Sequence, residues 1–316
     1  MADERGALAA FLAFGSGLRS EAVRVGVRCP AKVNLHLEVL GRRSDGYHEL
    51  RTIFAAVGAW DELSFESAPA GVLELAVEPP GAVPTGEDNL VVKAARALAE
   101  HIAVAPSARM RLRKGIPVAG GLGGGSADAA AALVGLTRLW GSREAPDELE
   151  PLAAGLGADV PFFLVGGVAW GVGRGSEVTP LPDLPPWWLV LVPGREPIPT
   201  AEVYRSLEAS TLDGDAGSEI YRWVIEGGEL PVGSCRNDLQ STVVRRSPEV
   251  GRRLERVHTT RPLLAMLSGS GGTVFGLYQD EARARQAAGE LGAFRPAVVP
   301  LLTRQASLLR PSVMEE

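Results

Sequence analysis

The segment Pro117-Val-Ala-Gly-Gly-Leu-Gly-Gly-Gly-Ser-Ala127, in the first half of the chain, decides how the fold is interpreted. Five of the seven residues from Gly120 to Ser126 are glycine, and an alanine-rich stretch with leucines at helical spacing follows as far as Trp140. Because glycine has no side chain, a ligand can approach this backbone closely. The free N–H groups and the dipole at a helix start attract negative charge. The segment therefore predicts a phosphate-binding loop leading into a helix at 126–140, with a flexible linker as the simpler alternative.

Two common phosphate motifs are excluded for this loop. A Walker A loop requires Gly-Lys-Ser/Thr at a fixed spacing, which is absent, and the dinucleotide-binding fingerprint requires glycine or alanine where Ser126 stands. A second glycine-rich segment, Ser268-Gly-Ser-Gly-Gly-Thr273, lies between two apolar stretches. Taken alone, it is typical of an ordinary connection between strands.

Outward from the loop, strands and helices mix without the regular alternation of a parallel sheet, which indicates the α+β class. Helical spacing predicts helices at 89–102, 126–140, 147–156 and 280–291. Prolines crowded between 180 and 186 indicate a domain boundary, which gives an extension at 1–22 that we expect to be disordered, a first domain at 23–184 and a second at 185–316. Apolar alternation predicts strands at 23–40 (with a possible interruption at Pro30), 47–57, 63–65, 73–77, 108–113, 187–192, 263–267, 274–278 and 297–302.

Composition excludes several classes of protein. The chain has 316 residues and a net charge of -6, whereas a general nucleic-acid binder needs a basic surface. It contains no apolar stretch of the ~20 residues that a membrane-spanning helix requires. The apolar run at 7–18 lacks the positive charge that precedes the core of a signal peptide. Cys29 and Cys235 are too few for a disulfide framework, so we expect a cytoplasmic protein.

Lysine is rare in this chain, which draws attention to the positions that keep it. Of the 32 basic residues only Lys32, Lys93 and Lys114 are lysine, and the other 29 are arginine. An ammonium group is a compact charge with a tunable pKa, whereas a guanidinium stays charged. Lys32 lies on the polar side of the first strand beside Asn34. A solvated side chain is the simpler interpretation of such a lysine.

Three further patterns allow a structural or a functional interpretation. Asp159, in Leu156-Gly-Ala-Asp-Val-Pro161, is typical of a helix N-cap, and a carboxylate at that place can also accept a proton. Tyr47 and His48 occupy adjacent strand positions, which predicts one core residue and one surface residue unless a ligand stacks there. The alternating arginines of 108–113 are expected to form a solvated strand face.

Three separated motifs together resemble those of the GHMP kinases, which phosphorylate hydroxyl groups of small molecules with ATP. They are Pro30-Ala-Lys-Val-Asn-Leu35, the glycine loop at 117–127 and Leu267-Ser-Gly-Ser-Gly-Gly-Thr273. The resemblance covers about residues 24–305. It is closest to a member that phosphorylates the tertiary hydroxyl of a cytidine diphosphate sugar alcohol. The segments that point to this member are Arg43-Ser-Asp-Gly-Tyr-His48, Glu87-Asp-Asn-Leu90, Leu156-Gly-Ala-Asp-Val-Pro161, Pro199-Thr200 with Tyr204, and Asn237-Asp-Leu239.

The resemblance implies two α+β domains, the first of which binds ATP, with the active site in the cleft between them. It implies that Lys32 and Asp159 form the catalytic pair, with Asp159 as the base for the substrate hydroxyl. Mg²⁺ is expected with ATP, held largely by phosphates and water. Contacts to ATP are implied for Pro117, Val118, Ala119, Gly120, Gly121, Leu122, Gly123, Gly124, Gly125, Ser126 and Ala127, with Asn89 and Lys114. Substrate contacts are implied for Asn34, Thr200, Tyr47, Tyr204 and His48; the two tyrosines would stack on the cytosine and His48 would hydrogen-bond it.

Two alternatives remain at this point. A GHMP kinase for homoserine or a mevalonate-type substrate would share the fold, but the Tyr47-His48 pair would have no purpose there. A non-catalytic nucleotide-binding relative would have no need of both Lys32 and Asp159. The sequence indicates a small-molecule partner and no nucleic-acid or membrane partner, and it leaves the oligomeric state and the protein ligands of Mg²⁺ open.

Overall fold

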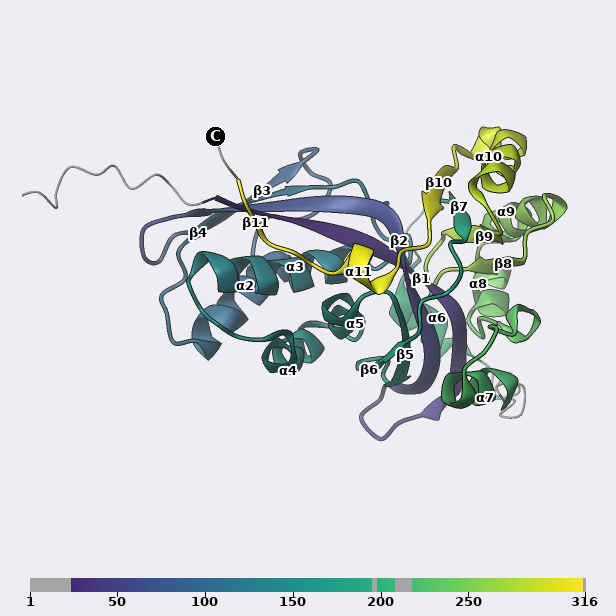
Figure 1. Cartoon of the computed structure of the whole chain (residues 1–316), viewed down its shortest axis with the longest axis horizontal. Coiled ribbons are helices and arrows are strands. Elements are labelled where there is room, and N and C mark those ends of the chain that lie inside the picture. Colours follow the sequence, from purple (N-terminus) through teal and green to yellow (C-terminus); the bar gives the residue numbers. More distant parts are fainter. Residues whose placement is uncertain (1–23, 195–197, 208–217, 315–316) are drawn as a thin grey trace, which may run out of the picture.

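The computed structural model describes residues 24–194, 198–207 and 218–314, so the extension predicted at 1–22 lies outside the described residues. The described residues form two β-sheets with helices packed against them. They are arranged as two lobes side by side, the first lobe around the larger sheet and the second lobe around the smaller one (Figure 1). Strands and helices are mixed, which confirms the predicted α+β class. No helix within the described ranges is both long enough and apolar enough to cross a membrane.

The larger sheet has seven strands in the described part of the chain. Their order is β11-β1-β2-β4-β3, with β5 paired to β2 and β6 paired to β5. All pairs are antiparallel except that of β3 with β4. Because β11 pairs with β1, the end of the described chain returns to the first sheet. The bounds are β1 (Arg24–Arg42), β2 (His48–Ser67), β3 (Leu73–Glu78), β4 (Ala108–Arg113), β5 (Val168–Gly173), β6 (Glu177–Leu181) and β11 (Ser312–Val313).

Helices α2 to α5 of the first half of the chain lie together on one side of this sheet, as Figure 1 shows. The core between them and the sheet includes Phe54 and Phe65 from β2 and Leu133 from α3, all of which are buried. Burial of side chains of this size contributes about 1.5–3 kcal/mol each. The helices are α2 (Leu90–His101), α3 (Gly124–Leu139), α4 (Pro146–Leu156) and α5 (Val160–Val165).

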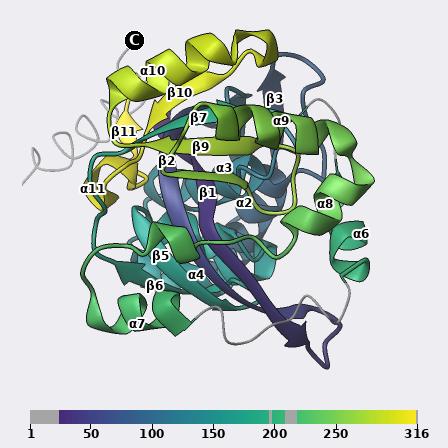
Figure 2. The ribbon, with the colours of Figure 1, turned by 90° about the vertical axis from the view of Figure 1, so that its right-hand side faces the viewer.

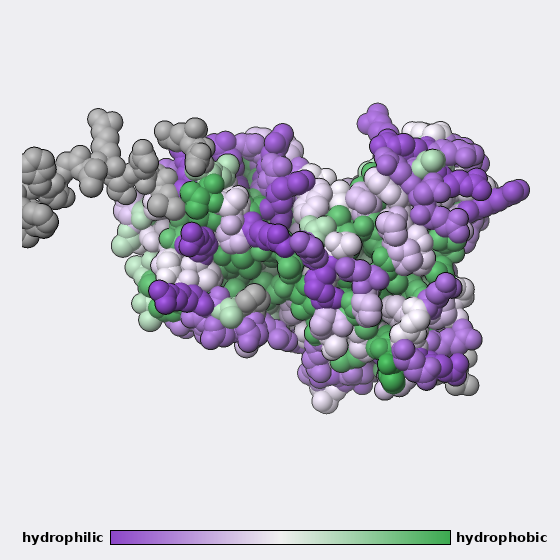
Figure 3. Space-filling view, viewed as in Figure 1, coloured by the Kyte–Doolittle hydropathy of each residue, from purple (hydrophilic) through white to green (hydrophobic). Residues whose placement is uncertain are grey.

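The second sheet has four antiparallel strands in the order β10-β7-β9-β8. Helices α9 and α10 pack beside it (Figure 2), and Figure 3 shows mostly hydrophilic residues on their outer surface. The bounds are β7 (Trp188–Val192), β8 (Leu264–Leu267), β9 (Val274–Tyr278), β10 (Ala297–Pro300), α6 (Thr200–Arg205), α7 (Ser218–Glu226), α8 (Gln240–Arg246), α9 (Pro248–Thr259), α10 (Glu281–Glu290) and α11 (Arg304–Ser307).

An irregularity in the pairing of β1 with β2 decides which way Lys32 points. Strand β1 is continuous from Arg24 to Arg42, but its register with β2 shifts by two residues between Pro30 and Ala31, where β2 carries the extra residues Gly58 and Ala59. Before the shift, Cys29 faces the helix-side core, and after it Val33 belongs to a core shared with the second sheet. Beyond the shift, Lys32 pairs with Ala56, which belongs to the helix-side core. Lys32 therefore points to the helix side, and the prediction of one uniform apolar face along 23–40 was wrong.

Other predictions of elements were partly wrong. Residues 63–65 are the end of β2 rather than a separate strand. The glycine-rich stretch 166–175 contains β5, which the sequence did not indicate because its glycines hide the alternation of buried and exposed positions. The strand at 108–113 was predicted correctly, and its arginines are exposed and paired with glutamates, as expected for a solvated face.

Candidate active site

An ion pair between β1 and the start of α5 lies at the centre of the candidate site. The Lys32 Nζ atom is 3.0 Å from Asp159 Oδ2 and donates a hydrogen bond of 2.7 Å to Asn34 Oδ1. The Lys32 side chain is buried, whereas 33% of the Asp159 side chain is exposed. Asp159 occupies the N-cap position of α5, but its side chain makes no capping hydrogen bond. The carboxylate is therefore paired with the ammonium and remains open to a ligand.

The amide of Asn34 is oriented by a chain of buried hydrogen bonds. Its Nδ2 donates to Thr52 Oγ1 at 2.8 Å, and that hydroxyl donates to the His36 carbonyl oxygen at 2.6 Å. Because Nδ2 is fixed in this way, Oδ1 is directed toward Lys32. Sequence reasoning missed Thr52, and its only signal was a hydroxyl in a mainly apolar strand.

The glycine loop leads from β4 to α3 and passes next to Lys32. The Lys32 N–H donates to the Leu122 carbonyl oxygen at 2.9 Å, and a Cβ at Gly123 would lie 2.9 Å from Lys32 Cγ. Gly121 and Gly123 have φ angles of 79° and 71°, a region that favours glycine. Helix α3 begins at Gly124, two residues before the predicted start, and no side chain caps it. Its first N–H groups are therefore available to a phosphate.

Two cavities meet at this loop. The larger has a volume of about 940 Å³ and contains the Lys32–Asp159 pair. The smaller has a volume of about 350 Å³ and is lined by the loop and by the start of α2. A molecule whose phosphates contact the loop can therefore occupy the smaller cavity and present its last phosphate to the larger one. The residues that line both cavities are Gly121, Gly123 and Ser126.

Aromatic side chains line the larger cavity, together with Thr200. The rings of His48 and Tyr204 are stacked with centroids 5.1 Å apart and an angle of 29° between their planes. The Arg174 guanidinium lies 4.8 Å from the centre of the Tyr47 ring. Burial and the charge of a nearby arginine lower the pKa of His48, which favours the neutral ring. The predicted aromatic residues thus share one cavity, although each tyrosine here contacts a protein side chain.

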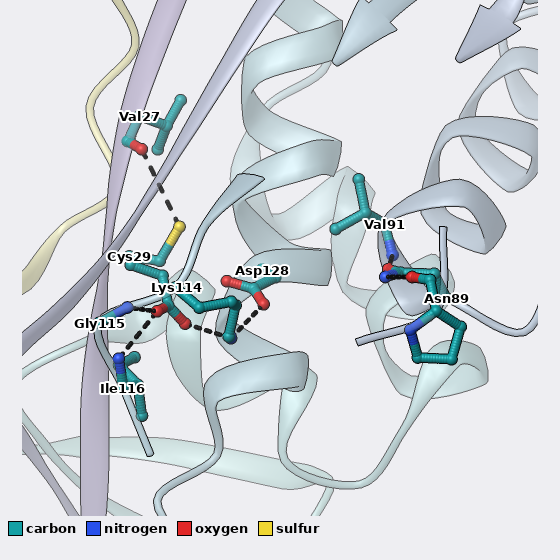
Figure 4. Close-up of polar contacts among 10 residues, drawn as sticks. Val27, Cys29, Asn89, Val91, Lys114, Gly115, Ile116 and Asp128 are labelled. Carbon is teal, nitrogen blue, oxygen red and sulfur yellow. Dashed lines mark hydrogen bonds and ion pairs between the residues drawn. The ribbon is translucent and has the colours of Figure 1, made fainter. Parts of the chain in front are cut away.

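Asn89 has a structural role in addition to lining the smaller cavity. It is the N-cap of α2, with Oδ1 accepting from the Val91 N–H at 2.9 Å and Nδ2 donating to the Pro84 carbonyl oxygen at 2.6 Å (Figure 4). Both ends of the amide are therefore occupied. The N-cap fixes the start of α2 at the edge of this cavity.

Lys114 lies between two buried carboxylates behind the loop. Its Nζ donates to Asp61 Oδ2 and, at 2.7 Å, to Asp128 Oδ2 in the first turns of α3 (Figure 4). Asp61 Oδ1 also accepts from the N–H groups of Gly115 and Ile116, at 2.6 and 2.9 Å. Burial raises the pKa of Asp128 to about 7; Lys114 opposes this increase and Asp61 adds to it. The cluster therefore ties the start of α3 to β2.

Asp61 was not singled out in the sequence because it lies between the strands predicted at 47–57 and 63–65, where an acidic residue is normally exposed. Replacing it by asparagine is expected to reduce the free energy of unfolding by about 3 kcal/mol, since one partner of a buried ion pair is lost. The loss is at the lower end of the usual range because Asp128 still pairs with Lys114. Urea denaturation measures the change.

Glu62 is the matched control for Asp61. Its side chain is 53% exposed and pairs with Arg113 at 3.5 Å. Glu62→Gln is expected to change stability by less than about 0.5 kcal/mol, as exposed ion pairs contribute little. Equal effects of Asp61→Asn and Glu62→Gln would show that the buried cluster does not hold this part of the fold.

Comparisons with known proteins show which family the chain belongs to. Residues 89–167 match the family model "GHMP kinases N terminal domain", and residues 228–297 match "GHMP kinases C terminal". The chain is 41% identical over 282 residues to the 4-diphosphocytidyl-2-C-methyl-D-erythritol kinase of Nocardioides sp., covering 86% of this chain and 95% of that protein. It is 44% identical over 274 residues to the enzyme of the same name from Paramagnetospirillum magneticum, with the same coverage of 86% and 95%.

Comparison with solved structures shows the same relationship in the fold. The crystal structure of a 4-(cytidine 5'-diphospho)-2C-methyl-D-erythritol kinase superposes with a TM-score of 0.73 at 36% identity, covering 87% of this chain and 98% of that one. A homoserine kinase from Cytophaga hutchinsonii has a TM-score of 0.72 at 18% identity, covers 94% of this chain and 98% of that one, and so shows the shared fold alone. The chain belongs to the GHMP kinases and, within them, to the family of the 4-diphosphocytidyl-2-C-methyl-D-erythritol kinases.

Proposed function

We propose that the protein transfers the γ-phosphoryl group of ATP to the 2-hydroxyl of 4-diphosphocytidyl-2-C-methyl-D-erythritol, giving the 2-phosphate and ADP in isoprenoid precursor biosynthesis. The observation that carries this proposal is the Lys32–Asp159 pair, 3.0 Å apart and beside the glycine loop. The free thiols of Cys29 and Cys235 favour the cytoplasm as its compartment.

The two charged groups suit phosphoryl transfer. The oxygen of the substrate hydroxyl forms a bond to the γ-phosphorus while Asp159 accepts the proton of that hydroxyl. At the same time the bond between the γ-phosphorus and the bridging oxygen breaks, and that oxygen leaves with ADP. Lys32, held by Asn34, keeps the carboxylate in place and offsets negative charge on the transferring group. Positioning and charge stabilisation of this kind account for most of the catalysis in such reactions.

We expect Mg²⁺ to bind together with ATP rather than at a separate site made by protein side chains. Within the described residues no three His, Cys, Asp or Glu side chains are grouped as a metal site. The Ser126 side chain lines both cavities at the start of α3, where its hydroxyl could serve as an oxygen ligand. Mg²⁺ bound by phosphates, water and this hydroxyl would neutralise charge on the phosphates.

The larger cavity suits an anionic nucleotide substrate. Its lining includes Arg42, Arg174 and Arg205, whose charges complement a diphosphate. Tyr47 and Tyr204 offer rings for stacking on the cytosine, and His48 offers a hydrogen bond to it. Homoserine and mevalonate contain neither a base nor a diphosphate, so this lining favours the cytidine substrate over both. The close Lys32–Asp159 pair argues against a non-catalytic nucleotide-binding protein.

One assay tests the proposal. The protein is incubated with Mg-ATP and separately with the cytidine diphosphate substrate, homoserine and mevalonate, and ADP release is followed. We expect ADP only with the first compound, with one new phosphate in the product by mass spectrometry. ADP formed only with homoserine or mevalonate would overturn the substrate assignment, and no ADP with any of them would support the non-catalytic alternative.

The exposed ring of Tyr47 gives a direct test of base stacking. Tyr47→Ala is expected to raise the KM for the cytidine substrate by about 10-fold or more, since stacking of a base on an aromatic ring contributes about 1–3 kcal/mol. The KM for ATP is expected to stay within about twofold, because ATP contacts the other cavity. Initial-rate kinetics with each substrate varied in turn measure both values.

Tyr221 is the matched control for Tyr47. The side chain of Tyr221 is 46% exposed and that of Tyr47 is 56% exposed, and each has an arginine over its ring. Tyr221 does not line the larger cavity, so Tyr221→Ala should leave both KM values unchanged. A similar increase in KM for both variants would remove the evidence for stacking at Tyr47.

A further inference from the structure

The motif Asn237-Asp-Leu239 has no part in the function proposed so far, yet Asn237 is buried between the two lobes. Its Nδ2 donates to the carbonyl oxygens of Leu267 and Gly269 at 2.9 and 2.8 Å. Its Oδ1 accepts from the Leu239 N–H at 2.9 Å. The amide therefore uses both hydrogen atoms of Nδ2 on the backbone where β8 ends and the second glycine-rich segment begins.

The backbone around Asn237 is fixed to β1 on the other side. The Leu37 N–H donates to the Arg236 carbonyl oxygen at 2.8 Å, and the Asp238 N–H donates to the Leu37 carbonyl oxygen at 2.9 Å. The Val39 N–H donates to Asp238 Oδ2 at 2.8 Å. Asn237 thus connects the strand that carries Lys32 and Asn34 to a turn of the second lobe.

That turn, residues 268–272, lies against the catalytic residues. A Cβ at Gly269 would be 3.3 Å from Asn34 Oδ1 and 3.6 Å from Lys32 Nζ. Gly269 has a φ of 57°, a conformation that glycine adopts readily and other residues rarely do. Its carbonyl oxygen is one of the two that Asn237 holds.

The same turn also contacts the phosphate loop. The Ser268 hydroxyl donates to the Gly121 carbonyl oxygen at 2.9 Å, and the Thr273 N–H donates to the Gly120 carbonyl oxygen at 3.2 Å. A Cβ at Gly271 would be only 2.3 Å from the Gly121 nitrogen. The two glycine-rich segments are therefore in backbone contact, and the position of one sets that of the other.

We infer that Asn237 is a positioning residue for the reaction: by holding the 268–272 turn, it fixes the distance between the phosphate loop and the Lys32–Asn34 side chains. Asn237 lines neither of the two cavities and acts through the turn. The inference deepens the proposed kinase function and rests on it for its kinetic consequence. Its structural consequence, the fixed turn, does not depend on the substrate.

The test compares two variants that each introduce one carboxylate. Asn237→Asp removes both hydrogen bonds to Leu267 and Gly269 and places an acceptor against two carbonyl oxygens. Gln240→Glu adds the same charge three residues away but keeps the acceptor that Gln240 Oε1 provides to the Leu267 N–H. Asn237→Asp is expected to lower kcat by about 30-fold, since a misplacement of about 1 Å costs up to about 100-fold. Gln240→Glu is expected to leave kcat within about twofold of wild type.

Two further readouts separate positioning from general stability. A purely structural role for Asn237 would lower Tm and leave the kcat of the folded enzyme at 25 °C unchanged, whereas a positioning role lowers kcat in protein that is folded by circular dichroism. Asn237→Ala removes the same two hydrogen bonds without adding a charge and is expected to lower kcat in the same way. It replaces Asn237→Asp if that variant does not fold.

Hydrogen exchange makes the test independent of the substrate. In Asn237→Asp, amide exchange at 268–273 and at 120–123 is expected to be about 10-fold faster than in Gln240→Glu, because each lost hydrogen bond stabilises the closed turn by about 1 kcal/mol or more. If wild type forms no ADP with the cytidine substrate, the proposed function fails, but this exchange comparison still decides the role of Asn237. Unchanged exchange, or a kcat of Asn237→Asp within about twofold of Gln240→Glu, would overturn the inference.

Discussion

Asp159→Asn is expected to lower kcat by about 10³-fold, within the range of about 10²–10⁴ that general acid–base catalysis contributes. The amide has the same shape as the carboxylate but cannot accept the proton of the substrate hydroxyl. Lys32 should stay in place, because its Nζ also donates to Asn34 Oδ1 at 2.7 Å. The affinity for ATP is therefore expected to remain within about twofold of wild type. Steady-state kinetics and calorimetric titration with ATP measure the two effects.

Asp280→Asn is the control for changing a carboxylate to an amide at a helix start. Asp280 is the N-cap of α10, and its Oδ1 accepts from the Arg283 N–H at 2.9 Å. Asparagine caps a helix about as well as aspartate, so neither stability nor kcat should change. Asp159 makes no capping bond, so the two variants differ through the loss of its charge beside Lys32 and of its ability to accept a proton. An Asp159→Asn enzyme with full activity would show that another group takes the proton.

The parts of this fold that sequence predicted well are those in which one short element has one buried face. Strand β4 was placed at its observed bounds because Ala108, Met110 and Leu112 are buried while the arginines between them are exposed. The helix at 89–102 was found for the same reason, with Asn89 as its N-cap. In such elements the periodicity of the sequence and the tertiary structure agree.

The parts that sequence missed depend on contacts between distant segments. The irregularity after Pro30 arises in the pairing with β2, where two extra residues of β2 shift the register, and the residues of β1 that face the helices differ before and after it. As a result Lys32 is buried beside Asp159, although its place in the alternation indicated a solvated face. No pattern within 23–40 contains this information.

The same limit applies to the residues that support the site. Lys32, Asn34 and Asp159 were predicted through motifs, and the structure brings these three together in one cavity. Thr52 and Asp61 support that site from β2, but neither stands in a motif. Each is a polar residue in a strand and acquires its partners only when the chain folds. The partners of such residues lie too far along the chain for spacing alone to reveal them.

The contact between the two glycine-rich segments gives the second large expected effect. Gly121→Ala is expected to lower kcat/KM for ATP by at least about 10²-fold and to reduce the free energy of unfolding by about 3–4 kcal/mol. A Cβ at this position would lie 2.1 Å from the Ser268 carbonyl oxygen and 3.0 Å from the Gly271 nitrogen. Because both neighbours are backbone atoms, the phosphate loop must move away from the turn, and its N–H groups move with it.

Gly141→Ala separates this collision from the cost of the backbone conformation alone. Gly141 has a φ of 71°, close to the 79° of Gly121, but no atom lies within 4 Å of the position that a Cβ would take there. Alanine at 141 should cost only about 1 kcal/mol, the usual penalty for a left-handed residue, and should leave kcat/KM for ATP unchanged. Chemical denaturation and initial-rate kinetics on both variants make the comparison. If Gly121→Ala proves no worse than Gly141→Ala, the two segments do not constrain each other, and the phosphate loop keeps its shape without the second lobe.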